Sequence, residues 1–308
     1  MKIIKTIGSN FNLKELTDVF NLSFSDYVIK FVVTEESLSQ KIQGDDISMD
    51  HSIGIYSELE ENKLEGFVLL APDDLKNPKR LYNAATGVVP TARGNKLIEK
   101  SISQTKSFFK ENGIKSIVLE VIQTNPRAIK VYENCGFKIN RELISYKGDF
   151  KSNDSLIKYL DSDKEFINNI MIEKVEKLTD HIIYFIENEN GCEKQPRMNP
   201  SWSNTNQVIQ REFNMGFNKI WLAKDNKTNE IIGFLSIHSK SERIRQIYVK
   251  PTYRNKNVAT KLIYTMLNEF QSFNVSNIEE GFDNLKNFFS KRIGLDFFVS
   301  QYEMELFL

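Results

Sequence analysis

A strand, a proline and an amphipathic helix occur in succession twice in this chain, over residues 247–263 and again over 87–98. Pro251 must end its strand, because proline cannot donate a hydrogen bond to a sheet ladder. From Val258 onwards apolar side chains recur at helical spacing, which predicts one face of an amphipathic helix. The two prolines, Pro90 and Pro251, are 161 positions apart. Two copies of one mixed α/β unit therefore account for the chain.

Polar residues separate the strand from the helix in the second copy, and two of them are cationic: Arg254, Asn255, Lys256 and Asn257. They lie where a helix presents backbone N–H groups without partners and the positive end of its dipole. That arrangement suits a phosphate or pyrophosphate group. An ordinary helix start is the alternative for one copy by itself, but the repeat favours a binding loop.

The length of the chain, 308 residues, predicts two domains of about 150 residues each. Apolar residues make up 40% of the sequence, which is enough for two ordinary cores. Residues 151–165 are polar and interrupted by Asp and Ser, so we expect the domain boundary there. The predicted organisation is a domain over 1–150, a linker over 151–165 and a second domain over 166–308. Within them, strand 81–89 should lie beside 116–122, and strand 245–249 beside 275–282.

The charge balance and the cysteines argue against several classes of function. With 41 basic and 41 acidic residues the net charge is zero, so no nucleic-acid partner is expected. Cys135 and Cys192 fall in different halves and, with three scattered histidines, make no metal-ligand spacing, so no metal is expected. No apolar run approaches the roughly 18 residues of a membrane span, and the N-terminus lacks a signal-peptide pattern. The expectation is a cytoplasmic protein that does not bind membranes.

A second pattern, NPRAIKVYENCGF over residues 125–137, follows Pro90 by one helix and one strand. It matches N-x-x-A-I-x-x-Y-x-x-x-G-F at every named position: Asn125, Ala128, Ile129, Tyr132, Gly136 and Phe137. A helical core stripe ended by a glycine cap is the purely structural interpretation. Together with V-x-P-x-[YF]-R-x-x-G-x-[GA]-x-x-L, which both copies approach, the pattern resembles motifs A and B of the GCN5-related N-acetyltransferase (GNAT) superfamily. The resemblance covers nearly the whole chain.

The resemblance implies two tandem domains of the α/β class, each a mostly antiparallel sheet with a splayed central strand pair flanked by helices. It also implies acetyl-coenzyme A as co-substrate, with the pyrophosphate held by the motif A loop. The residues expected to bind the coenzyme are Val88, Val89, Arg93, Gly94, Asn95, Lys96, Asn125, Val249, Arg254, Asn255, Lys256, Asn257, Val258 and Ala259. Backbone N–H groups near Val88 and Val89 would stabilise the oxyanion. Tyr132 would assist the departing sulfur, and Glu120 is the candidate base, with a water relay as the alternative.

The two halves depart from the family pattern in complementary ways. In the first, Lys96 and Ile98 occupy positions that the family fills with small residues, which crowds a phosphate loop. In the second, Asn257 replaces a glycine, a tolerable change because asparagine adopts left-handed conformations. Counting back from Gly294, however, places Ser290 where the family has tyrosine. The first half therefore keeps the chemical residue, and the second keeps the better phosphate loop.

The leading hypothesis is a tandem N-acetyltransferase with one competent site, in the N-terminal half, and a degenerate partner domain. The acetyl group would pass by direct attack to a primary amine of a small molecule or peptide. One alternative is a non-catalytic acyl-CoA-binding or interaction protein, favoured by Lys96, Ile98 and Ser290. Another is an aminoacyl-tRNA-dependent transferase, which the neutral charge disfavours. The acceptor and the oligomeric state stay open.

Overall fold

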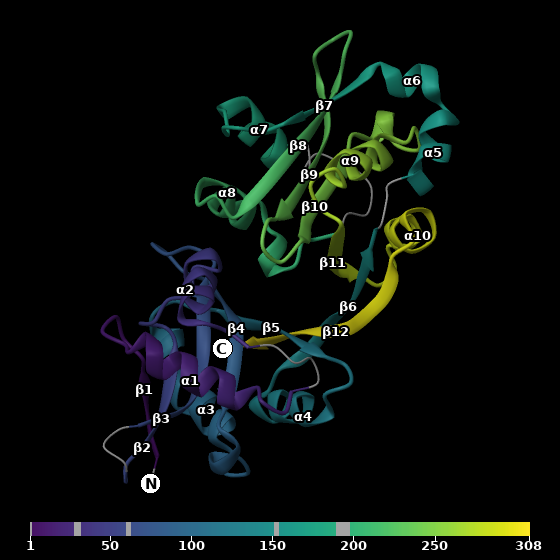
Figure 1. Cartoon of the computed structure of the whole chain (residues 1–308). Coiled ribbons are helices and arrows are strands. Elements are labelled where there is room, and N and C mark those ends of the chain that lie inside the picture. The colour runs from purple at the N-terminus through teal and green to yellow at the C-terminus, as the bar shows by residue number, and fades with distance from the viewer. Residues whose placement is uncertain (1, 28–31, 60–62, 151–153, 189–197) are drawn as a thin grey trace. The chain divides into compact units, whose positions relative to one another are not determined.

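The chain forms two units, which the computed structural model describes over residues 2–27, 32–59, 63–150, 154–188 and 198–308 (Figure 1). The first unit consists of Met1–Glu142 together with Ser300–Leu308, and the second of Leu143–Val299. The segment assigned above to a linker, 151–165, falls within the second unit. From Asp154 on it is helical, with η2 (Asp154–Leu156), α5 (Ile157–Asp161) and the start of α6 (Lys164–Asn168).

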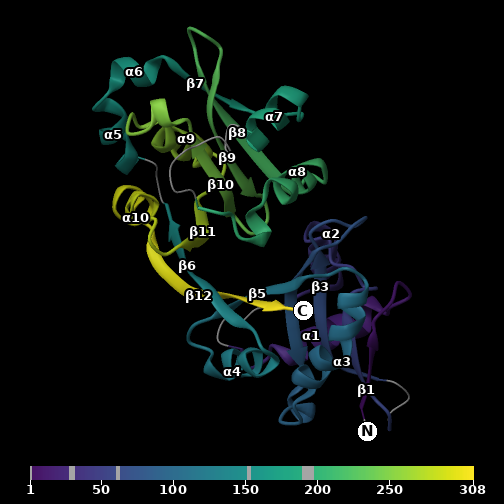
Figure 2. The ribbon, with the colours of Figure 1, turned by 180° about the vertical axis from the view of Figure 1, so that it is seen from behind.

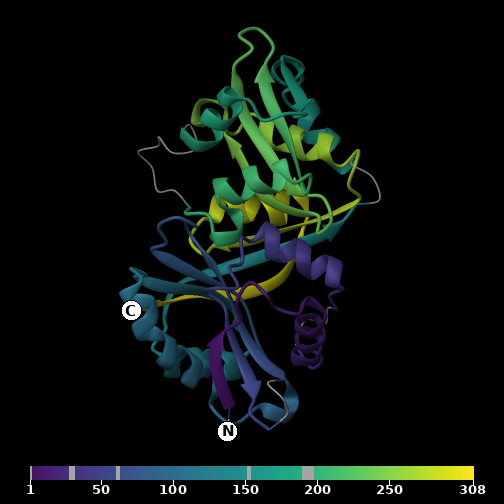
Figure 3. The same cartoon turned by 90° about the vertical axis from the view of Figure 1, so that its left-hand side faces the viewer.

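The first unit is a mixed sheet with the strand order β1-β2-β3-β4-β5-β12. Its elements are β1 (Lys2–Thr6), α1 (Leu13–Ser23), α2 (Glu35–Gly44), β2 (Ile53–Ser57), β3 (Leu64–Pro72), β4 (Arg80–Val88), η1 (Pro90–Ala92), α3 (Leu97–Glu111), β5 (Ser116–Ile122), α4 (Pro126–Cys135), the start of β6 (Lys138–Asp149) and the end of β12 (Asp296–Phe307). Helices α1 and α2 lie on one face of the sheet and α3 on the other (Figure 3). Asn12 caps α1, since its Oδ1 accepts a hydrogen bond from the Glu15 N–H at 3.1 Å.

The second unit repeats this plan with the strand order β6-β11-β10-β9-β8-β7. Its remaining elements are β7 (Ile170–Lys174), α7 (Asp180–Asn188), η4 (Trp202–Asn204), α8 (Asn206–Asn214), β8 (Asn218–Asp225), β9 (Ile231–His238), β10 (Arg243–Val249), η5 (Pro251–Tyr253), α9 (Val258–Met266), β11 (Ser272–Glu279), α10 (Asp283–Asn287) and the π-helix η6 (Phe288–Ile293). Helix α9 lies on the opposite side of the sheet from α7 and α8 (Figure 2).

The strand that completes each sheet comes from an unexpected part of the chain. In the first unit β12 pairs antiparallel with β5, from Gln301 opposite Ile122 to Phe307 opposite Ser116. In the second unit β11 pairs antiparallel with β6, whose residues follow the motif B helix of the first half. The first unit therefore ends its sheet with the last residues of the chain, whereas the sequence predicted a contiguous domain over 1–150.

Each unit contains the predicted pair of parallel neighbours. β4 pairs with β5 over Arg80–Tyr82, and β10 pairs with β11 over Arg243 and Ile244. Beyond these residues the strands of each pair diverge, which confirms the splayed central pair. Each of β4 and β10 also carries a bulge just past the paired part, at Ala84 and Arg245. Bulges bend a strand and increase its twist, so they turn β4 and β10 away from their parallel partners.

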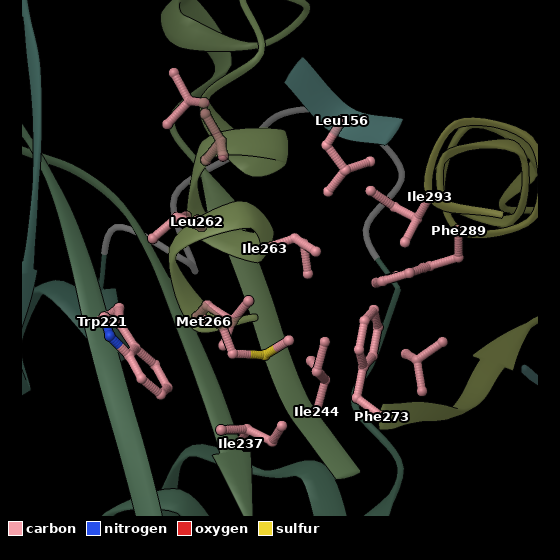
Figure 4. Close-up of a cluster of buried hydrophobic side chains, with 14 of the residues drawn as sticks. Leu156, Trp221, Ile237, Ile244, Leu262, Ile263, Met266, Phe273, Phe289 and Ile293 are labelled. Carbon is pink, nitrogen blue, oxygen red and sulfur yellow. The ribbon is translucent and has the colours of Figure 1, made fainter. Parts of the chain in front are cut away.

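One core cluster of the second unit lies between its sheet and α9 (Figure 4), and another lies between the sheet and helices α7 and α8. Ile263 and Met266 of α9 meet Phe273 of β11, while Phe289 enters the same cluster from η6. Leu156, which is fully buried, also joins this cluster and explains why the polar segment around it is helical and packed. In the described part of the chain, no helix is long and apolar enough to cross a membrane.

Candidate functional site

The divergence of β10 and β11 opens a cavity of about 1410 Å³ in the second unit. Its lining includes Val249 at the end of β10, Ile278 on β11 and Ala259 in the first turn of α9. Ligands of open α/β sheets bind in crevices at the carboxyl ends of strands, where neighbouring strands separate. This cavity is therefore the candidate binding site of the second unit.

The loop before α9 has the backbone that phosphate binding requires. Asn257 is left-handed, with φ 60° and ψ 11°, as the substitution of asparagine for glycine predicted. Asn255 is also left-handed, with φ 60°, and in the first unit the two positions 161 residues earlier have positive φ as well. There Gly94 has φ 81° and Lys96 has φ 52°. The two loops therefore share one conformation, although Lys96 adopts it with a side chain that resists positive φ.

The helices that follow these loops begin without a side-chain cap. Neither Lys96 at the start of α3 nor Asn257 at the start of α9 accepts a hydrogen bond from its helix. By contrast, Asn125 caps α4 and Thr205 caps α8. The first N–H groups of a helix have no partner within the helix. The two N-termini are thus left available to an anionic ligand, which supports the expected pyrophosphate sites.

The motif A arginines shape these loops. Arg93 Nε donates to the Val88 carbonyl at 3.0 Å, and Arg254 Nε donates to the Val249 carbonyl at 3.0 Å. Each bond ties the loop to the end of the preceding strand. Arg93 also donates to both carboxylate oxygens of Asp26, at 2.6 and 2.9 Å, and this contact holds the pKa of Asp26 below its ordinary value. Because these arginines are bonded within the protein, the loops would bind a phosphate chiefly through their backbone N–H groups.

Basic and aromatic side chains gather around the α9 end of the cavity. Arg292 Nη1 donates to Asn257 Oδ1 at 2.5 Å, and the Arg292 guanidinium lies 4.8 Å from the centre of the Tyr159 ring. Tyr159, Lys291 and Arg292 all line the cavity. The positive charges of Lys291 and Arg292 favour an anion at this end of the cavity. The sequence does not single out these residues, because Tyr159 lies in the presumed linker and the two cations occupy positions of motif B that the family pattern leaves unspecified.

Only one of the two predicted oxyanion donors in the first unit points to the open side of the strand. The Val89 N–H donates to the Glu65 carbonyl of β3 at 2.9 Å, as the Lys250 N–H does to Ile232 at 2.8 Å. Successive N–H groups of a strand point to opposite sides. The N–H groups of Val88 and Val249 therefore face the side from which the parallel partner strand has diverged.

Tyr132 lies in a polar cluster at the divergence of β4 and β5. Its phenol hydrogen-bonds with Asn83, which precedes the bulge in β4, and with Thr86, which follows it. Burial raises the pKa of Tyr132 to about 12, although the hydrogen bond with Thr86 opposes the shift. The neighbouring motif B residue, Asn125, hydrogen-bonds with Tyr27. Tyr132 is therefore protonated at neutral pH and can donate a hydrogen bond to a developing anion.

Glu120 lies on the diverging part of β5, two residues beyond the last residue paired with β4. Its carboxylate accepts a hydrogen bond from the Tyr82 hydroxyl at 2.5 Å. On the other side of β5 the residue in register with Glu120 is Glu303 of β12, whose carboxylate accepts from Arg141 at 2.6 Å. Glu120 is thus held by Tyr82, and its role as the base stays a prediction.

Motif B of the second unit differs from that of the first by one residue. In α4 the Phe137 N–H donates to the Tyr132 carbonyl, whereas in η6 the Leu295 N–H reaches back one residue further, to Phe289. The π-helix contains this extra residue. Phe289, which is fully buried, therefore corresponds to Tyr132, and Ser290 instead donates to the Lys286 carbonyl at 2.7 Å. The count that equated Ser290 with tyrosine was off because no sequence signal marks the π-helix.

The cavity unites most of the predicted residues of the second half. It is lined by Val249, Arg254, Asn255, Asn257, Val258 and Ala259, while Lys256 lies outside the lining with its ammonium 5.1 Å from the centre of the Phe166 ring. In the first unit a smaller cavity of about 320 Å³ lies beside the α3 N-terminus and includes Lys96. Arg93, Gly94 and Asn95 do not line this cavity. They come near it only because they directly precede Lys96 in the chain.

Comparisons with known proteins agree with this fold. The model of the Acetyltransferase (GNAT) family matches residues 16–137 and 184–292, so the chain belongs to the GNAT acetyltransferase family, with two tandem copies of the fold. The family transfers acyl groups from acyl-CoA. Within the described residues, no group of three or more His, Cys, Asp or Glu side chains could hold a metal.

Several solved structures share this architecture. A tandem GNAT protein from the clavulanic acid biosynthesis pathway aligns over 100% of this chain and 98% of its own, at 10% identity and a TM-score of 0.70. A GCN5-related N-acetyltransferase from Sphaerobacter thermophilus aligns over 99% and 95%, at 10% identity and 0.67. A glucosamine N-acetyltransferase region of a fungal multi-domain protein aligns over 99% of this chain and 38% of its own, at 13% identity and 0.71. At these identities the likeness concerns the fold. No curated protein matches the chain.

Variants of Asn257 test the phosphate loop of the second unit. Asn257→Gly should keep its affinity for acetyl-coenzyme A, since glycine adopts positive φ freely. Asn257→Val should lower the affinity of that site about tenfold or more, because a β-branched residue resists positive φ. Calorimetric titration measures both. Equal binding by the wild type and the Val variant would mean that this loop does not hold the coenzyme.

Proposed function

We propose that the protein is an N-acetyltransferase that moves the acetyl group of acetyl-coenzyme A to a primary amine by direct attack. The observation that carries this proposal is the pair of uncapped helix N-termini, each preceded by the same left-handed loop, one of them opening into the cavity between β10 and β11. Both loops would hold the pyrophosphate of an acyl-CoA. The chemical step is assigned to the first unit, because Tyr132 supplies a phenol where the second unit has Phe289.

In the proposed reaction the amine nitrogen, after losing a proton to water or to Glu120, attacks the thioester carbonyl carbon. A C–N bond forms and the negative charge on the carbonyl oxygen meets the Val88 N–H. The C–S bond then breaks, the electron pair leaves with the sulfur, and the nitrogen loses its second proton to water to give the neutral amide. A thiol has a reference pKa of ~8.5, well below that of the Tyr132 phenol. Tyr132 therefore stabilises the thiolate by a hydrogen bond more than by complete proton transfer.

Release of coenzyme A in the presence of amines tests the proposal. The panel contains polyamines, aminoglycosides, amino acids, peptide N-termini and glucosamine, the last because a structural relative is described as a glucosamine N-acetyltransferase region. We expect thiol release that depends on one class of amine, with equal formation of the acetylated product. Binding of acetyl-coenzyme A without amine-dependent release from any member of the panel would contradict the proposal.

A non-catalytic acyl-CoA-binding protein is the second candidate. One observation favours it: in the unit with the large cavity, the position of the leaving-group phenol is a buried phenylalanine, Phe289. Such a unit could bind the coenzyme without assisting the departure of the thiolate. The two candidates differ in the thiol assay and agree in the binding assay.

A further inference from the structure

Thr260 of α9 carries a buried hydroxyl that has no hydrogen-bond partner. The residue is 1% exposed, and its Oγ1 meets no donor or acceptor among the residues that the structure describes. A threonine within a helix can bond the carbonyl four residues earlier, and Thr265 of α9 does so, to Lys261 at 2.9 Å. For Thr260 that carbonyl belongs to Lys256, which precedes the helix and its left-handed residue Asn257. The start of the helix therefore leaves this hydroxyl unpaired.

Thr260 also lines the cavity between β10 and β11, together with Asn257 and Val258 of the phosphate loop. It is the third residue of α9 and thus lies in the turn whose N–H groups have no partner within the helix. A buried hydroxyl costs free energy while it is unpaired, and phosphate oxygens are strong acceptors. A phosphate group at this N-terminus would pair the hydroxyl and the N–H groups together.

The first unit has a carboxylate at the corresponding position. Glu99, 161 positions before Thr260, is the third residue of α3 and the acidic residue of its first turn. Burial raises the pKa of the Cys135 thiol to about 12, and the negative charge of Glu99 adds to this shift. Because Cys135 belongs to α4, the Glu99 carboxylate lies near the motif B helix of its unit. It therefore occupies the side of α3 on which the strands diverge.

The two loops differ in hydrogen-bonding capacity and not in net charge. The first carries Lys96 and Glu99 where the second carries Asn257 and Thr260, so the two added charges cancel. A hydroxyl can donate to a phosphate oxygen, whereas an ionised carboxylate only accepts. A carboxylate in the first turn also interacts with the positive end of the helix dipole, which an incoming anion would have to share. The second unit therefore offers a phosphate one more donor and no competing carboxylate in the first turn.

We propose that the second unit binds acyl-CoA more tightly than the first, because Thr260 donates a hydrogen bond to the pyrophosphate where Glu99 cannot. A hydrogen bond to a charged acceptor corresponds to about tenfold or more in affinity. The unit with Phe289 then fills at coenzyme concentrations at which the unit with Tyr132 is still largely empty. This inference rests on the proposed function in one respect, namely that the ligand of both loops is an acyl-CoA.

Amide hydrogen exchange at increasing concentrations of acetyl-coenzyme A measures each site by itself in the full-length protein. The N–H groups of Asn257–Thr260 report on the second unit, and those of Lys96–Glu99 report on the first. We expect the α9 segment to reach half of its maximal slowing at a concentration at least about tenfold lower than the α3 segment does. Half-slowing of both segments at one concentration, or of α3 at the lower one, would overturn the inference and leave acyl-CoA binding intact. No slowing at either segment would contradict the proposed function, and the inference with it.

Variants of Thr260 assign the difference to its hydroxyl. Thr260→Val removes only an unpaired group and should fold, and the concentration for half-slowing of α9 should rise about tenfold. Thr260→Ser keeps the hydroxyl and should keep the wild-type concentration, whereas Thr260→Glu copies the first unit and should bring the two segments together.

Thr265→Val is the matched control, because it removes a hydroxyl of the same helix that is bonded to Lys261 and does not line the cavity. It should leave the concentration for half-slowing of α9 unchanged. Wild-type behaviour of Thr260→Val, or an equal weakening in Thr265→Val, would overturn the proposal.

Discussion

Removal of residues 300–308 is expected to unfold the first unit, although these residues are the last of the chain. Met304 and Leu306 are 0% and 3% exposed within that unit, and deletion of each buried side chain costs about 2–5 kcal/mol. The truncation also removes Glu303, the buried carboxylate that pairs with Arg141, and leaves β5 as an open edge. Because a domain is stabilised by only about 5–15 kcal/mol in total, these losses together are as large as the whole stability of a typical unit.

Hydrogen exchange of β3, β4 and β5 measures this outcome, and their amides should exchange rapidly after truncation. Both tryptophans, Trp202 and Trp221, belong to the second unit, so their fluorescence reports separately that this unit stays folded. Met304→Ala and Phe307→Ala form a matched pair, since Phe307 is 69% exposed and its loss should matter little. Slow exchange of β5 in the truncated protein would show that the first unit does not need β12.

Tyr132→Phe is expected to lower kcat by about 10²-fold, the small end of the range for general acids. The effect is moderate because coenzyme A thiolate is already a fair leaving group and Tyr132, with a pKa near 12, contributes mainly a hydrogen bond. KM for acetyl-coenzyme A should change little, because the ring stays and only the hydroxyl is removed. Steady-state kinetics with the amine found in the panel measures both constants.

Ser290→Ala is the control for this prediction. Its hydroxyl donates to the Lys286 carbonyl within its own helix, so its removal should leave turnover unchanged. Activity of Tyr132→Phe equal to that of the wild type would move the chemical step away from the first unit. Loss of activity in Ser290→Ala would point to the second unit instead.

The sequence alone predicts the local features of this fold well, because each has a local physical cause. The helix at Leu13 begins where Asn12 can cap it, and Asn257 replaces glycine where the loop needs positive φ. These two features depend on neighbours in the chain, which a sequence displays directly. The divergence after Tyr82 and after Ile244 was instead implied by the resemblance to the GNAT superfamily.

Features that depend on distant partners are not predictable in the same way. Strands β6 and β12 are similar amphipathic segments, and nothing in either says that β12 rather than β6 pairs with β5. The helix around Leu156 depends on a core supplied by the rest of the second unit. Arg245, which lines the cavity, resembles an exposed strand residue until the bulge and its hydrogen bond to Glu212 are seen together. The phosphate loops of the candidate site were therefore predictable from the sequence, whereas the other residues that line its cavity were not.

Amide hydrogen exchange with and without acetyl-coenzyme A tests the central claim most directly, namely that acyl-CoA binds at the uncapped N-termini of α3 and α9. Bound pyrophosphate should accept hydrogen bonds from the first N–H groups of these helices and slow their exchange. The account predicts slower exchange over Lys96–Glu99 and over Asn257–Thr260 at saturating coenzyme, while α1 and α7 keep their rates. Unchanged exchange at both N-termini, with slowing elsewhere in the chain, would contradict it.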